Sequence, residues 1–201
     1  MRLFQQPAGG GAFRAVLLFL GVYLLSLLIW LPVKVYYGYA MTFVASKLVA
    51  GLKDARLEEI TGDADILQAT FSPFMRGSDV LVDIPVKTSS YTFNTPLTAG
   101  ILAALYPFLT RRRRALSEAA LMLLAVHFLY VFSLEAKTLT EAFMQQGMEA
   151  DNSLKLMGYQ FFWAFTENMV IRFEPFLIGF YVFLRFGRRG PAKTRAAVSA
   201  A

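Results

Sequence analysis

The sequence predicts an integral membrane protein, mainly α-helical, with about four transmembrane helices and a small extracytoplasmic β hairpin or sheet between spans one and two. Three observations lead to this fold class. Of the 201 residues, 56% are hydrophobic and 15% are aromatic, which is too apolar for a soluble domain. Several apolar runs have the length of a membrane span. Basic residues are concentrated between these runs.

The composition also excludes several classes of function. Spans of about 20 residues each leave no room for a large catalytic domain outside the bilayer. The chain has no cysteine, and therefore no disulfide, thiolate nucleophile or cysteine metal site. The net charge of +6 comes from residues that flank apolar runs, which favours control of membrane topology over nucleic-acid binding. We expect no cofactor, no metal and no nucleic-acid partner.

The N-terminal region predicts the first span. A cytoplasmic N-terminus over 1–14 precedes an uncharged run of 19 residues at 15–33. A cleaved secretory signal is the alternative, since Arg2 and Arg14 precede the run, but the run exceeds a signal core and no small-residue cleavage site follows. Residues 34–52 carry tyrosines and lysines, and form either an interfacial helix or an extension of the first span.

Residues 53–95 are predicted to be an extracytoplasmic strand-rich segment. Within 79–87, the sequence DVLVDIPVK alternates branched apolar side chains with other residues, which is typical of a strand. Pro85 indicates an edge strand, because proline has no amide proton for a central ladder. A weaker strand signal lies in 55–71, before a turn-rich linker, and predicts a hairpin or a small sheet.

The next segment predicts two spans joined by a tight turn. The second span, 96–110, is short and reaches spanning length only by including residues 91–95. The basic turn 111–114 leads directly into the third span, 115–134. Residues 135–158 are expected to be an extracytoplasmic helix and loop.

The fourth span, 159–185, has charged residues in its first half. Pro175 removes one backbone hydrogen bond and is expected to kink or break the helix. Residues 159–174 then either span the bilayer beside a cavity or lie on its surface. The remaining residues, 186–201, are expected to be a disordered cytoplasmic tail.

Loop charges predict the orientation of the chain. Residues 1–14, 111–114 and 185–201 hold eleven basic residues and no acidic ones. Residues 53–92 and 135–158 hold six basic against eleven acidic residues. Because basic loops stay in the cytoplasm, both termini and the basic turn are expected there.

The topology-setting basic residues are Arg111, Arg112, Arg113 and Arg114. Near a leaflet each charge could attract anionic lipid by about 1 kcal/mol. Setting the topology alone is the favoured interpretation of this block, with contact to membrane lipids as a secondary effect.

Five polar residues in apolar surroundings are candidate intramembrane or partner contacts: His127, Glu167, Asn168, Arg172 and Glu174. For the single histidine, a neutral imidazole bonded between helices is favoured over a metal ligand or a catalytic base. The two glutamates, seven residues apart, share one helix face, while the asparagine and arginine lie on an adjacent face. We expect the arginine to pair with a glutamate, either within the structure or directed towards a partner, with a carboxylate pair for hydrolysis or a proton path as alternatives.

The order of these parts resembles the exosortase H-associated membrane proteins, small accessory proteins of bacterial exosortase systems. The likeness covers most of residues 15–186, and its motifs are short. They are IWLPV at 29–33, SSYTFNTPLTAGILAALYP at 89–107, RRRR at 111–114, MGYQ at 157–160 and EPFLIGFYVFLRF at 174–186. The chain departs from the family pattern at TFNTPL, where an asparagine–proline step before a more glycine-rich run is expected.

The resemblance implies a Gram-negative inner membrane and a role beside a transpeptidase-like protease that sorts proteins with a C-terminal membrane tail. Exosortases resemble one another in an intramembrane Cys, His and Arg constellation, so a chain without cysteine is not that protease. No phosphate loop, nucleophile elbow or paired-histidine zinc motif is present, and no catalytic residue is expected.

The leading hypothesis is a non-catalytic accessory membrane protein that docks onto a membrane partner, an exosortase or its substrates. One alternative is a small subunit of a transporter, channel or other membrane complex, with the intramembrane polar residues lining a pore. A weaker alternative is an intramembrane hydrolase that uses Glu167 or Glu174 as a base with His127.

Overall fold

The computed structural model describes residues 8–62, 65–74, 80–147 and 153–187. Within them the chain is mostly helical, with one small sheet. The elements in chain order are α1 (Ala8–Leu52), β1 (Ala55–Gly62), β2 (Ile66–Pro73), β3 (Val82–Lys87), α2 (Ser89–Thr92), α3 (Asn94–Leu105), the 3₁₀ turn η1 (Tyr106–Phe108), α4 (Arg112–Gln145), α5 (Ser153–Phe165), the π-helical segment η2 (Thr166–Ile171) and α6 (Arg172–Phe186).

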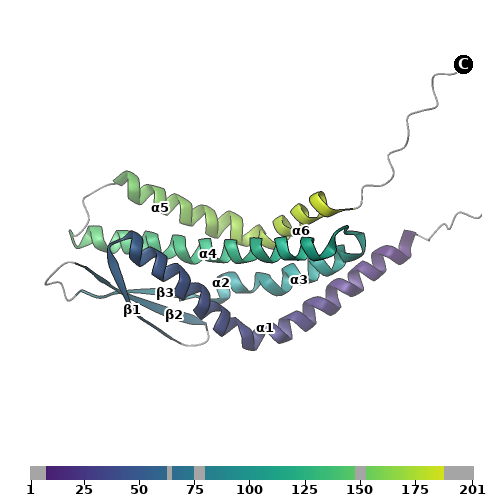
Figure 1. The fold of residues 1–201 in the computed structure, drawn as a ribbon, viewed down its shortest axis with the longest axis horizontal. Coiled ribbons are helices and arrows are strands. Elements are labelled where there is room, and N and C mark those ends of the chain that lie inside the picture. Colours follow the sequence, from purple (N-terminus) through teal and green to yellow (C-terminus); the bar gives the residue numbers. More distant parts are fainter. Residues whose placement is uncertain (1–7, 63–64, 75–79, 148–152, 188–201) are drawn as a thin grey trace, which may run out of the picture.

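The helices form an elongated bundle with the sheet at one end (Figure 1). Helix α4 runs the length of the molecule, with α1 along one side and α5, η2 and α6 along another. The sheet lies where α1 and α4 end, and the turn that precedes α4 lies at the opposite end. Two of the described helices, Gly11–Leu52 within α1 and the whole of α4, are long and apolar enough to cross a membrane.

Residues 34–52 belong to the same continuous helix as the predicted first span. Helix α1 is unbroken over 45 residues and bends near its middle (Figure 1), where Pro32 lies inside it. A proline in a helix removes one backbone hydrogen bond, which accounts for the bend. At about 1.5 Å per residue, α1 is roughly twice as long as the hydrocarbon core of a bilayer.

Helix α4 extends beyond the predicted end of the third span at 134. It reaches Gln145, so the first part of 135–158 belongs to this helix. Good helix formers fill the extension, and Gly147 follows it with φ of 69°, as is usual after a helix end. The charges that suggested an exit from the membrane at Glu135 lie along this helix, and two of them form the Lys137–Glu141 pair at 3.3 Å.

The last helical segment begins at Ser153, earlier than the predicted 159, and remains helical through Pro175. The expected break is replaced by the π-helical turn η2, which ends three residues before Glu174. A π-turn inserts one residue into a helix and shifts the faces that follow it. The seven-residue spacing of the two glutamates therefore does not place them in equivalent positions.

The strand-rich segment is a three-stranded antiparallel sheet in the order β1-β2-β3. The predicted strand is β3, and Pro85 lies on an edge strand as expected. The weaker signal splits into two strands instead of one, paired from Ala55 with Pro73 to Gly62 with Leu67. Gly62 has φ of 132°, a conformation that favours glycine and marks the end of β1.

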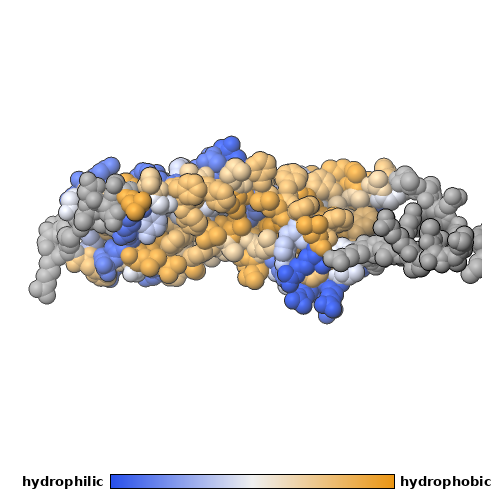
Figure 2. Space-filling model, turned by 90° about the horizontal axis from the view of Figure 1, so that it is seen from above, coloured by the Kyte–Doolittle hydropathy of each residue, from blue (hydrophilic) through white to orange (hydrophobic). Residues whose placement is uncertain are grey.

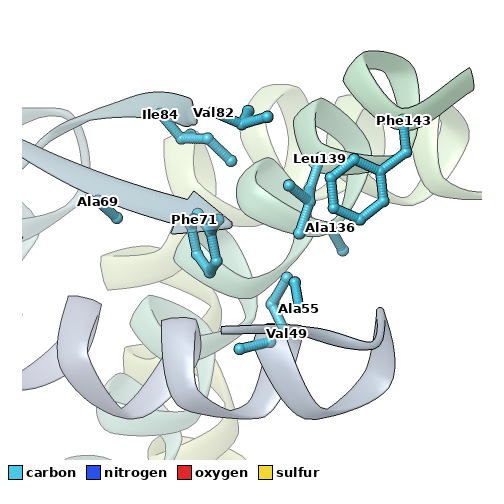
Figure 3. Packing of buried hydrophobic residues seen from close by; sticks show 10 residues of the cluster. Val49, Ala55, Ala69, Phe71, Val82, Ile84, Ala136, Leu139 and Phe143 are labelled. Carbon is cyan, nitrogen blue, oxygen red and sulfur yellow. The ribbon is translucent and has the colours of Figure 1, made fainter. Parts of the chain in front are cut away.

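One face of the sheet packs between the ends of α1 and α4 (Figure 3). Phe71 and Ile84 are buried there against Leu139 and Phe143 of α4 and Val49 of α1. The sheet therefore has no independent core and shares one with the long helices.

At the other end of the bundle, small residues let the helices approach closely. A Cβ at Gly179 of α6 would lie 2.6 Å from Cγ2 of Ile101 in α3. A Cβ at Gly100 would lie 3.1 Å from the ring of Phe19 and from Cβ of Tyr23 in α1. Small residues at contacts are typical of helices that associate in membranes.

Replacing Phe71 by alanine should destabilise the sheet by about 3–5 kcal/mol, because it removes a fully buried ring from the shared core. Leu81→Ala is the matched control, since this side chain is 59% exposed and should change stability by about 0.5 kcal/mol or less. The measurement is limited proteolysis of residues 53–88 in mild detergent during thermal unfolding. Equal protection of the two variants would contradict this packing.

Candidate functional site

A buried polar cluster lies near the middle of the bundle and involves all four helical stretches. Tyr37 comes from α1, Asn94 from the start of α3, His127 from α4 and Glu174 from α6. The side chains of His127 and Glu174 have no exposed surface. We call these four residues the polar junction.

The histidine of the polar junction is bonded through both ring nitrogens. Its Nε2 lies 3.2 Å from Oε2 of Glu174, and its Nδ1 lies 2.7 Å from the Tyr37 hydroxyl. These contacts fit a neutral ring whose Nε2 donates to the carboxylate, which is the tautomer that we predict. Nδ1 of the neutral ring then accepts from the Tyr37 hydroxyl. The partners thus select one tautomer and one ring orientation.

Asn94 compensates for the proline in α6. In an α-helix the carbonyl of Ile171 would accept from the amide of residue 175, but Pro175 has no amide proton. Nδ2 of Asn94 donates to that carbonyl at 2.6 Å and also to Oε2 of Glu174 at 2.9 Å. Both acceptors require a donor, which fixes the orientation of the amide. One side chain from α3 therefore satisfies the backbone and the carboxylate of α6 together.

Aromatic rings enclose the polar junction. Tyr37 and Tyr91 each meet the imidazole of His127 edge-on, with ring centroids 5.6 and 5.3 Å apart. Tyr130, one turn after His127 in α4, packs against the ring of Tyr91. These contacts exclude solvent, which strengthens the hydrogen bonds inside.

A second buried carboxylate joins α1 to α4 nearer the sheet. Ser46 donates to Oε1 of Glu135 at 2.7 Å, and both side chains are fully buried. The other oxygen of Glu135, and Oε1 of Glu174, have no hydrogen-bond partner among the described residues. A buried carboxylate oxygen without a donor is costly.

The five candidate residues have different environments. His127 and Glu174 are brought together in the polar junction. Glu167 is half-buried, and Asn168 is exposed and bonds only to the carbonyl of Ala164 in its own helix. Arg172 is exposed and makes no salt bridge with a glutamate among the described residues, so a pair with a glutamate of a partner stays a prediction. The carboxylate of Glu174 is bonded by the imidazole of His127 and the amide of Asn94 instead.

Sequence reasoning missed two members of the polar junction. Tyr37 lies in a cluster of tyrosines that indicated a membrane interface, and nothing in the sequence separates it from Tyr36, which is 79% exposed. Asn94 lies in TFNTPL, which drew notice only as a departure from a family pattern. The missing amide at Pro175 was a usable signal, because an orphaned carbonyl in a membrane helix needs a donor.

The line from the Tyr37 hydroxyl through His127 to Glu174 has the order of a hydrolase triad. A triad acts on a substrate that reaches the hydroxyl, whereas here imidazole and carboxylate are completely enclosed. No three His, Asp or Glu side chains converge in a metal-binding arrangement within the residues that the structure describes. The geometry is suited to holding helices together.

Long apolar helices joined by buried polar bonds, with close contacts at glycine, are features of helical membrane proteins. The sequence matches the model of the exosortase H-associated membrane protein family over residues 10–186. The chain belongs to that family of membrane proteins, as its sequence resemblance suggested. No curated protein and no solved structure matches it.

Replacing Asn94 by leucine should destabilise the bundle by about 1–2 kcal/mol, because it leaves the Ile171 carbonyl without a donor and removes one from Glu174. Asn168→Leu is the matched control, since its bond is exposed and within one helix, and should cost about 0.5 kcal/mol or less. The measurement is reversible unfolding of the purified chain by SDS in mixed micelles. Equal stability of the two variants would contradict the role of the polar junction.

A double-mutant cycle separates the two bonds of Asn94. Pro175→Ala restores the amide that can bond to Ile171, so Asn94→Leu should cost less in this background, by about 1 kcal/mol. An unchanged cost would mean that the bond to the carbonyl contributes nothing.

Proposed function

We propose that the chain is a non-catalytic accessory membrane protein that docks onto a membrane partner, an exosortase or its substrates, with the exosortase as the first candidate. Family membership supports the association with exosortases. One structural observation supports docking. The buried polar groups bind one another across the chain's own helices, whereas the last helical segment has a large uncovered apolar face.

This outer face is defined by large side chains between 48% and 72% exposed on α5, η2 and α6. They are Phe161, Phe165, Met169, Phe173, Phe176 and Phe180. Figure 2 shows one side of the molecule, on which hydrophobic surface extends along most of the long axis. Aromatic and methionine side chains are common at protein interfaces, and all six of these side chains are exposed.

Arg172 places a guanidinium on the outer face, and lipid tails offer it no hydrogen-bond partner. It is exposed among the aromatic residues and has no carboxylate partner in the described chain. An arginine on such a face is suited to a carboxylate or a backbone carbonyl of a neighbouring membrane helix. Asn168, one turn earlier and also exposed, adds a second polar group.

The proposal includes a four-span topology in a bacterial inner membrane, with both termini cytoplasmic. The basic turn and the end of α6 lie at one end of the bundle, and the acidic-rich sheet lies at the other (Figure 1). Residues 89–108 are helical almost throughout, which supplies about 20 residues for the second span. This arrangement supports the basic end as the cytoplasmic one.

Co-expression with an exosortase from the same genome and purification through a tag on this chain tests the proposal. The exosortase should be recovered in mild detergent, and Arg172→Glu should reduce its recovery several-fold by placing the wrong charge on the outer face. Lys47→Glu is the control, since Lys47 is an exposed lysine of α1 on another side. A chain that always elutes alone would count against docking.

The alternative of a transporter or channel subunit rests on the unpartnered oxygen of Glu174, which is a feature of proton and ion pathways. It requires water at the polar junction. The chain has no cysteine, so single cysteines report access cleanly. Thr98→Cys, buried one turn from Asn94, should stay unlabelled by a soluble maleimide while exposed Leu81→Cys reacts fully. Comparable labelling at both positions would favour the pathway.

A further inference from the structure

A basic cavity lies at the end of the bundle opposite the sheet, and no residue of the outer face lines it. It has a volume of about 680 Å³ and is lined by Tyr106, Leu109, Thr110 and the four arginines of the turn 111–114. Its wall is fixed to the end of α6, because the amide and the hydroxyl of Thr110 both donate to the carbonyl of Phe186, at 2.7 and 2.9 Å.

Most of the positive charge at this cavity is not neutralised. Glu118 is the acidic residue that pairs there, with Arg114 at 3.0 Å and Arg185 at 3.1 Å. The other three arginines of the turn, 111–113, make no salt bridge within the described chain. The cavity therefore favours an anion.

An apolar cavity of about 440 Å³ adjoins the basic one between α1, α3 and α4. Leu18 and Val22 of α1, Ala99 and Ala103 of α3, and Leu116 of α4 line it. The two alanines leave space between larger neighbours, and Leu116 is 40% exposed at its rim. A site of this kind fits a hydrocarbon chain.

Tyr106 connects the two cavities, since it lines both of them. The guanidinium of Arg112 stacks on its ring at 4.5 Å from the centroid. Arg14 lies one turn before Leu18 on α1, so the same helix face carries a further cation towards the charged end. Positive charge and apolar surface thus meet at one residue.

We propose that the two cavities form one binding site for an anionic phospholipid, with its phosphate at the arginines and one acyl chain in the apolar cavity. A soluble anion would not use the apolar part, and a zwitterionic lipid would not use the uncompensated charge. Setting the topology explains arginines in a loop, but it does not explain a chain-sized cavity next to them. The site is independent of the docking proposal, because it lies away from the outer face of α5 and α6.

Native mass spectrometry of the purified full-length chain tests this site with phosphatidylglycerol and phosphatidylcholine of identical acyl chains. Phosphatidylglycerol should be retained in preference to phosphatidylcholine. Arg112→Gln with Arg113→Gln should reduce that preference by about fivefold for each arginine removed. The matched control Lys47→Gln with Lys87→Gln removes the same charge elsewhere and should leave the preference unchanged.

Ala103→Phe fills the apolar cavity and should weaken retention of both lipids. If this variant does not elute as a folded protein, Leu18→Trp narrows the cavity from α1 instead. Equal retention of the two lipids by the parent chain would overturn the proposal, as would full retention in the cavity-filling variant. Displacement of phosphatidylglycerol by inorganic phosphate alone would also overturn it, because the acyl chain would then contribute nothing.

Discussion

The fold depends on satisfying polar groups where the surroundings are apolar. Glu174 and the carbonyl of Ile171 are both buried in the last helical segment, and neither can be left without a donor at low cost. Asn94 and His127 supply those donors, and Tyr37 completes the hydrogen bonding of the imidazole. Because these bonds exist only in one arrangement of the helices, they specify how the helices pack.

Around the polar junction the molecule divides into two regions with different packing. Towards the basic end, α3, α4 and α6 share an apolar core in which glycine allows close contact. Towards the sheet, polar contacts join α4 to α5, including Gln160 with Glu141 at 2.9 Å and Lys137 over the ring of Trp163. The packing at the basic end therefore resembles that of membrane helices, whereas the end near the sheet has polar contacts like those of a water-exposed domain.

The periodicity and charge of the sequence were sufficient for the mostly helical class and the edge strand with Pro85, and they singled out His127 and Glu174, which the structure brings together. They were insufficient where tertiary contacts override local signals. Glu135 was expected only as a charge at the exit of the third span, and its bond to Ser46 of α1 inside the bundle could not be predicted from the sequence. The bonds of Glu174 to Asn94 and His127 come from other helices, which residue spacing within the last helical segment cannot reveal.

The central claim is that the polar junction is a closed structural connection. His127 is the only histidine, so ¹⁵N-histidine labelling gives nitrogen signals from a single imidazole in the membrane-embedded protein. We predict a neutral ring with the proton on Nε2, hydrogen-bonded to Glu174 and slow to exchange with water. A ring protonated on Nδ1 alone, or a ring proton in rapid exchange with solvent, would contradict this account.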